Sequence, residues 1–147
     1  MPHLVLLYTP NLDALVPMAR LCRELADTLL SQRDEAGQAV FPQGGVRVFA
    51  VAAQHSAVAD GGAAGRVAGG DGDYGFLYLN LRMGGGRSAA VHQRCGDALL
   101  QCASAHVRPA QAAHHIGLTV QIDAAPGQVY DGKLSNLHPL FVSPSLG

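Results

Sequence analysis

Residues 74–88 read YGFLYLNLRMGGGRS and contain, in order, a strand pattern, a turn and the start of a helix. The apolar and aromatic run at 74–82 predicts a strand. GGGRS then turns the chain, and Ser88 is a residue type that commonly caps a helix N-terminus. We expect the helix to end before Pro109, because proline lacks the amide hydrogen that helix pairing needs. The apolar residues at helical spacing in between are Val91, Cys95, Ala98, Leu99 and Cys102.

The same order of elements occurs on both sides of the chain's midpoint. The run HLVLLY at 3–8 predicts a buried strand, and residues 18–32 predict an amphipathic helix. A second strand is predicted at 46–53, VRVFAVAA, and a fourth at 117–123, GLTVQID. The predicted fold class is therefore α/β, or α+β, built as a tandem β-α-β repeat.

We interpret the chain, 1–147, as a single domain made of two halves. The halves span approximately 1–56 and 74–125. Between them, 57–73 is a link that we expect to be too rich in glycine to pack. The C-terminal tail, 126–147, is expected to form turns or a short hairpin that docks elsewhere on the molecule.

The handedness of β-α-β units and the expected burial of their strands indicate that several chains assemble together. Each β-α-β unit favours a right-handed crossover with its two strands parallel. Two units would form one four-stranded sheet with both helices on one face. The strands read as apolar on both sides, so the other face needs a second layer. We therefore expect an oligomer, with partner subunits as that layer.

Composition excludes several classes of function. A chain with 48% hydrophobic and 14% charged residues can bury a core, and a net charge of -1 gives no reason to expect a nucleic-acid partner. No apolar run is long enough to suggest a membrane span. The start MPHLVLLYTP has no basic region typical of a secretory signal. A soluble, cytoplasmic protein is predicted.

Pro2 is the first candidate for chemistry, because it directly follows the initiator methionine. Removal of Met1 before such a small residue would expose a secondary amine. Apolar packing and neighbouring arginines would lower the pKa of that amine toward neutrality, where it could act as a general base. The alternative is an ordinary chain start.

Arg47 and Arg87 are the next candidate site residues, because both are expected at strand ends beside glycines. Guanidinium groups bind carboxylates through two parallel hydrogen bonds. The alternative is two solvated surface arginines. GGGRS lacks both the Lys-Ser/Thr ending of a phosphate loop and the G-x-G-x-x-G spacing, so nucleotide binding is not predicted.

No metal site is predicted. Among seven histidines, His114 and His115 are adjacent and would point to opposite faces, and we identify no Cys/His grouping typical of zinc. The three cysteines, which include Cys22, have no C-x-x-C spacing and are interpreted as small buried residues in a reducing compartment.

Several separated motifs are more specific than any single residue. They are MPHLV at the start, FPQGGVRV at 41–48, GDGDYGFLYLNLRMGGGRS at 70–88 and KLSNLH at 133–138. Together they cover nearly the whole chain, which resembles 5-carboxymethyl-2-hydroxymuconate isomerase of the tautomerase superfamily. The resemblance implies a tandem β-α-β fold assembled as a homotrimer.

The resemblance also implies a mechanism without a cofactor. Pro2 would be a general base that shuttles a proton on a 2-hydroxymuconate-type acid from aromatic-compound breakdown, giving its unsaturated ketone. Arg47 and Arg87 would bind the substrate carboxylates and stabilise an enolate-like transition state. Tyr8, Tyr78 and Asn80 are candidates to line the substrate site, and packing roles are the alternative for each.

Three departures from the family pattern leave the substrate open: Leu7 in the first strand, Gly69 in the glycine-rich segment and Ser135 in the tail. One alternative is another reaction of the superfamily, such as hydration, decarboxylation or dehalogenation of an unsaturated acid. Another is a trimeric protein of the same fold without catalysis.

Overall fold

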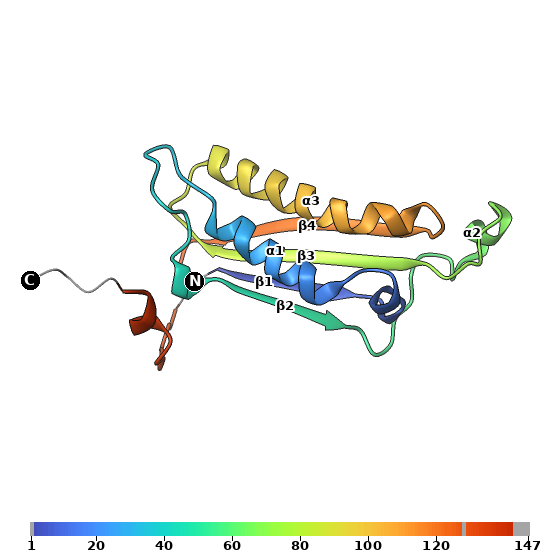
Figure 1. Ribbon diagram of the computed structural model, residues 1–147, viewed down its shortest axis with the longest axis horizontal. Helices are drawn as coiled ribbons and strands as arrows, with labels where there is room; N and C mark the ends of the chain where they lie inside the picture. The colour runs from blue at the N-terminus through green and yellow to red at the C-terminus, as the bar shows by residue number, and fades with distance from the viewer. Residues whose placement is uncertain (1, 128, 143–147) are drawn as a thin grey trace, which may run out of the picture.

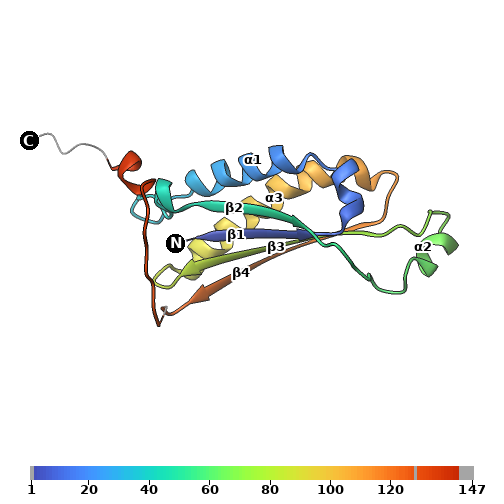
Figure 2. The ribbon, with the colours of Figure 1, turned by 90° about the horizontal axis from the view of Figure 1, so that it is seen from below.

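The computed structural model describes residues 2–127 and 129–142 and contains one four-stranded sheet with two long helices on one face (Figures 1 and 2). The predicted fold class is confirmed. The strands are β1 (His3–Tyr8), β2 (Arg47–Ala52), β3 (Gly75–Gly84) and β4 (Ile116–Ala125). The helices are α1 (Met18–Leu30), α2 (Ala63–Val67) and α3 (Ala89–Gln111), with 3-10 turns η1 (Pro10–Ala14), η2 (Gln43–Gly45) and η3 (His138–Phe141).

The sheet has the order β2-β1-β3-β4. β1 pairs with β2 in parallel and β3 pairs with β4 in parallel, as expected for two β-α-β units. The two halves meet in the middle, where β1 and β3 are antiparallel. The N-terminus, η2 and the tail therefore gather at one end of the sheet, while α2 lies at the other end (Figure 1).

The core lies between the sheet and the two long helices. Strict alternation along β1 and β3 turns one set of side chains to the helices. Ser88 caps α3 as predicted, because its side-chain oxygen accepts a hydrogen bond from the backbone N–H of Val91. The fully buried leucines of this core are Leu4, Leu6, Leu12, Leu21, Leu25, Leu29, Leu77, Leu79, Leu81 and Leu99.

The opposite face of the sheet is uncovered in a single chain, and its two halves differ. On β1 and β2 it presents Val5, Leu7, Phe49 and Val51, which are between 38% and 51% exposed. On β3 and β4 the outward positions are largely polar, so the expectation of strands apolar on both sides is wrong for this half. Hydrogen bonds between side chains of the two strands occupy several of these polar groups.

The expected end of the second long helix is also wrong, because α3 continues through Pro109 to Gln111. Proline removes the hydrogen bond to the carbonyl four residues earlier, which belongs to Ala105. Both residues lie on the exposed side of the helix, so water can hydrate that carbonyl.

The glycine-rich segment packs, contrary to expectation, and carries α2. Gly62 has φ +94°, and a Cβ there would lie 2.0 Å from the carbonyl oxygen of Gly72. Glycine thus allows two backbone segments to touch. The backbone N–H of Gly65 donates a 2.8 Å hydrogen bond to the hydroxyl of Tyr74. The role of 57–73 as a link between halves stays a prediction.

Within the described ranges, no helix combines the length and apolarity that a bilayer crossing requires.

Replacing Leu99 tests the helix–sheet core. Leu99→Ala should lower the free energy of unfolding by about 2–5 kcal/mol, because Leu99 is fully buried and its truncation leaves a cavity. Gln101→Ala is the matched control on the exposed side of the same helix and should change it by no more than about 0.5 kcal/mol. Urea unfolding followed by circular dichroism measures both. Equal effects would contradict this placement of the core.

Candidate active site

Pro2 lies directly before β1, at the end of an interior strand of the sheet, and is buried. It continues the alternation of β1, in which every second residue faces the helices. Its carbonyl oxygen accepts a hydrogen bond from the backbone N–H of Arg47, at 3.3 Å. The first residue of β2 therefore fixes the backbone of Pro2.

The turn η2 packs on Pro2 from the side of the FPQGG motif. A Cβ at Gly45 would lie 2.8 Å from Cγ of Pro42 and 3.6 Å from Cδ of Pro2. Because the first distance is shorter than real contacts allow, any larger residue would displace the turn. A glycine at this position thus lets the turn approach the proline ring.

Pro2 and Arg87 line one small cavity of about 150 Å³. Nη2 of Arg87 donates a 2.7 Å hydrogen bond to the carbonyl oxygen of Val40, which ties the arginine to the segment before η2. A guanidinium has five N–H donors, so this bond leaves others for an anion. The remaining lining residues are Val40, Phe41, Pro42, Met83 and Gly84.

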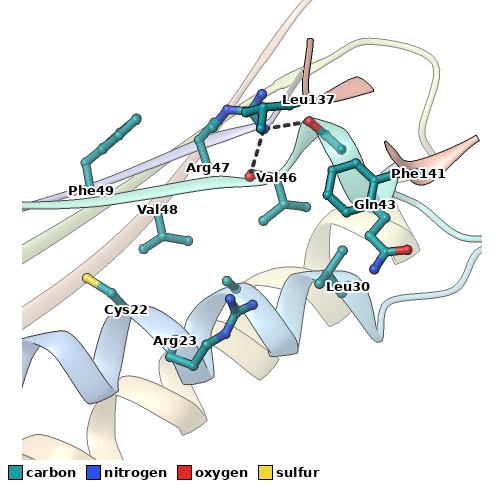
Figure 3. A pocket seen from close by; sticks show the side chains of 12 residues that line it. Cys22, Arg23, Leu30, Gln43, Val46, Arg47, Val48, Phe49, Leu137 and Phe141 are labelled. Carbon is teal, nitrogen blue, oxygen red and sulfur yellow. Dashed lines mark hydrogen bonds between the residues drawn. The ribbon is translucent and has the colours of Figure 1, made fainter. Parts of the chain in front are cut away.

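Arg47 is not among the residues that line this cavity, and it lines a second one of about 530 Å³ instead (Figure 3). Its Nη1 donates hydrogen bonds to the carbonyl oxygens of Gly44, at 2.6 Å, and Val46, at 3.1 Å. Figure 3 shows the side chain turned away from α1, on the other side of β2. The two cavities share no lining residue: Gly44 of η2 lines the larger, and Pro42, directly before η2, lines the smaller.

The tail closes the outer end of the larger cavity. Leu137 and Phe141, the latter in η3, are among its lining residues. A Cβ at Gly44 would lie 3.0 Å from Cδ2 of Phe141, so the tail packs directly on η2. The described part of the tail docks through η3, whereas residues 128 and 143–147 of the predicted tail lie outside the described residues.

Positive charge gathers at the proline end of the sheet. His3 is in register with Arg47 on β2 and with Arg82 on β3. Partial desolvation lowers the pKa of His3, and the positive charges of the two arginines lower it further. This end of the sheet therefore favours an anionic ligand.

The other three predicted site residues lie elsewhere in the chain. Tyr8 is at the far end of β1, where its hydroxyl donates a 2.6 Å hydrogen bond to Oδ1 of Asp13. On the exposed face, the Tyr78 hydroxyl donates to Gln121 at 2.7 Å.

Asn80 also lies on that exposed face, and its amide donates to Oδ2 of Asp123 at 2.8 Å. None of the three lines the cavity of Pro2 and Arg87. Their contact with substrate stays a prediction.

Sequence reasoning missed Met83 and Val40 as cavity residues. Met83 could have been found by extending the alternation of the buried Leu77, Leu79 and Leu81 by two residues, which turns it toward the helices. Val40 precedes the FPQGG motif, and nothing in its local pattern indicates that its carbonyl oxygen holds Arg87.

A family model for 5-carboxymethyl-2-hydroxymuconate isomerase matches residues 2–141. The chain belongs to this family. It is therefore an isomerase of the tautomerase superfamily, as the resemblance predicted.

Similar solved structures agree with the assignment to the 5-carboxymethyl-2-hydroxymuconate isomerase family. A 5-carboxymethyl-2-hydroxymuconate delta-isomerase is 55% identical with a TM-score of 0.92, over 97% of this chain and 94% of that chain. A 5-carboxymethyl-2-hydroxymuconate isomerase from Deinococcus radiodurans R1 is 29% identical with a TM-score of 0.77, over 97% and 95%. A fused 4-OT, 14% identical with a TM-score of 0.52 over 94% and 98%, shares the fold. No curated protein matched the sequence.

The pH dependence of stability tests the position of Tyr8 in this family member. The hydrogen bond to Asp13, followed by burial, raises the pKa of Tyr8 to about 12, above the ordinary value of about 10. The folded protein thus keeps the phenol proton to higher pH than the unfolded chain does. The contribution to stability is complete below about pH 10 and is lost as the pH rises through the folded pKa.

Tyr8→Phe should remove this pH-dependent contribution to the free energy of unfolding. The difference in unfolding free energy between wild type and variant should shrink as the pH rises from about 10 toward the folded pKa of about 12. Urea unfolding across this range measures it. A difference that stays constant would show that the Tyr8–Asp13 bond is not formed.

Proposed function

We propose that this isomerase moves a proton on 5-carboxymethyl-2-hydroxymuconate, with the amine of Pro2 as general base and Arg47 and Arg87 as carboxylate ligands. The observation that carries the proposal is the cavity shared by Pro2 and Arg87. The delta-isomerase that is 55% identical supports the choice of substrate.

In the proposed reaction no atom is gained or lost. The unprotonated amine, exposed by removal of Met1, takes the proton of the substrate's 2-hydroxyl group. Electrons then shift along the conjugated chain as the hydroxyl becomes a carbonyl. The ammonium so formed returns the proton to a carbon of that chain, giving the unsaturated ketone and the free amine. No cofactor enters the cycle.

The arginines hold the acid and stabilise the negative charge that develops on the dienolate. Fixed cationic donors act most strongly where they need no reorganisation during the reaction. Arg87 meets this requirement in part, because its bond to the carbonyl oxygen of Val40 orients the guanidinium before substrate binds. Arg47 is oriented in the same way by the carbonyl oxygens of Gly44 and Val46.

The size of the cavity supports a site completed by another subunit. Its volume of about 150 Å³ is well below the roughly 300–1,000 Å³ of ordinary ligand pockets. The exposed apolar residues on β1 and β2 need a covering layer. We propose a homotrimer in which neighbouring chains cover this face and add walls to the site, and such walls are where Tyr8, Tyr78 and Asn80 could reach substrate.

The enzyme is further proposed to act in the cytoplasm, in the breakdown of aromatic compounds. Its proposed binding partner is a small carboxylated acid, and neither nucleic acid nor a membrane is a proposed partner.

Pro2→Ala tests the base. The variant retains an amine but loses the secondary amine of the ring, so kcat/KM for the conversion of 5-carboxymethyl-2-hydroxymuconate should fall by about 10²–10⁴. Pro10→Ala, at an exposed proline beyond the far end of β1, is the control and should retain activity. Ultraviolet absorbance of the conjugated substrate follows the reaction. Unchanged activity of the correctly folded Pro2→Ala protein would rule out the proline mechanism.

Arg87→Ala tests the anion site. Losing a charge-assisted hydrogen bond of about 1.5–3 kcal/mol should lower kcat/KM roughly 10- to 150-fold, and Arg47→Ala should behave similarly. The kcat/KM of Arg87→Lys should lie between those of the wild type and Arg87→Ala, because lysine keeps the charge but lacks the planar guanidinium. Arg108→Ala, at an exposed position in the last turn of α3, is the control. If the Arg87 and Arg108 variants were equally active, carboxylate binding by Arg87 would be excluded.

A further inference from the structure

Three side chains with different ligand chemistry meet between the two long helices. Glu24 comes from α1, and Cys102 and His106 come from α3. A carboxylate oxygen, a thiol sulfur and an imidazole nitrogen of these residues all lie within 4.8 Å of one another. None of the three lines the cavity of Pro2 and Arg87, so the cluster is separate from the proposed active site.

The two long helices hold these three side chains in fixed positions. Cys102 and His106 are four residues apart on α3, which places them on one face, one turn from each other. Nε2 of His106 lies 2.6 Å from Oε2 of Glu24. The His106 side chain is 9% exposed, whereas Glu24 is 41% exposed. The imidazole is therefore held between the helices, and the carboxylate has room to adjust.

Thiolate, imidazole and carboxylate are the three ligand types that zinc takes from proteins. Zinc bonds of about 2.0–2.3 Å at tetrahedral angles separate the ligand atoms by about 3.2–3.7 Å. The His106–Glu24 separation must widen by less than about 1 Å to reach this range, and the widest pair must close by a similar amount. Such shifts are within the reach of side-chain rotation.

The carboxylate also has an outer partner. Nε of Arg20 donates a 2.8 Å hydrogen bond to Oε1 of Glu24, leaving Oε2 directed at His106. Carboxylates that bind metals are commonly oriented by a hydrogen bond of this kind. The arginine side chain is 74% exposed, so water screens its charge.

We propose that Glu24, Cys102 and His106 form a zinc site that links α1 to α3, with water as the fourth ligand. No metal site is predicted from the sequence, where Cys102 and His106 are not identified as a pair and supply only two ligands. The third belongs to a helix in the other half of the chain and is brought near by the packing of α1 on α3.

Cobalt(II) is the probe, because it occupies zinc sites. Its absorption spectrum shows both the coordination geometry and whether a thiolate is a ligand. The full chain, first treated with a chelator under reducing conditions, is titrated with Co²⁺ and then with Zn²⁺ as competitor. We expect the visible bands of tetrahedral cobalt and a near-ultraviolet thiolate band, and both should disappear as zinc displaces cobalt.

Variants assign the ligands. Cys102→Ser should remove the thiolate band, and His106→Asn and Glu24→Gln should each weaken zinc binding by at least about tenfold. The matched control is Cys22→Ser, another half-buried cysteine, whose side chain faces the cavity of Arg47 instead. It should bind as the wild type does. All variants are first checked for native circular dichroism, and Cys102→Ala replaces any serine variant that fails to fold.

The proposal is overturned if wild-type protein shows no thiolate band, or if the Cys102 variant binds zinc as tightly as the Cys22 variant. Since binding is measured without substrate, it is independent of whether Pro2 is the base. Saturating zinc should also raise the midpoint of thermal unfolding in wild type and in the Cys22 variant, and not in the Cys102 variant.

Discussion

The hydrogen bond from the backbone N–H of Arg47 to the carbonyl oxygen of Pro2 is the contact on which the proposed site depends. It begins the parallel pairing of β1 with β2 and fixes the proline at the end of the sheet. The same pairing brings η2 onto the proline ring, where Gly45 leaves no room for a larger side chain. One backbone contact thus joins the sheet, the FPQGG turn and the candidate base.

The fold explains why the chemistry lies at a strand end. Inside the sheet, the backbone of β1 is paired with a strand on each side and its inward side chains lie in the core, so the start of the strand is where an amine can border a cavity. At the strand end, Pro2 is buried yet borders a cavity with Arg87. The exposed apolar face of β1 and β2 links the site to the proposed homotrimer, because a subunit that covered that face would come close to the same strand end.

Periodicity predicted what depends on local pattern. The strands, the helix faces and the Ser88 cap follow from alternation, helical spacing and side-chain chemistry within a few residues. Features that depend on solvent or on distant segments were not predictable in this way. Pro109 is tolerated because its side of α3 is exposed, and Gly62 packs because Gly72 lies opposite it. Arg87 is oriented by the carbonyl oxygen of Val40, a residue distant in sequence.

Peptide mapping of the native protein by mass spectrometry, after reaction with a carboxylated α-keto alkyne, shows whether Pro2 carries a free, reactive amine. If Pro2 is a free base beside Arg87, the N-terminal peptide begins at Pro2 and carries the adduct on its amine, with little adduct in the Arg87→Ala variant. An N-terminal peptide that retains Met1, or an unmodified proline in protein that binds the reagent elsewhere, would contradict a free amine acting beside bound carboxylates.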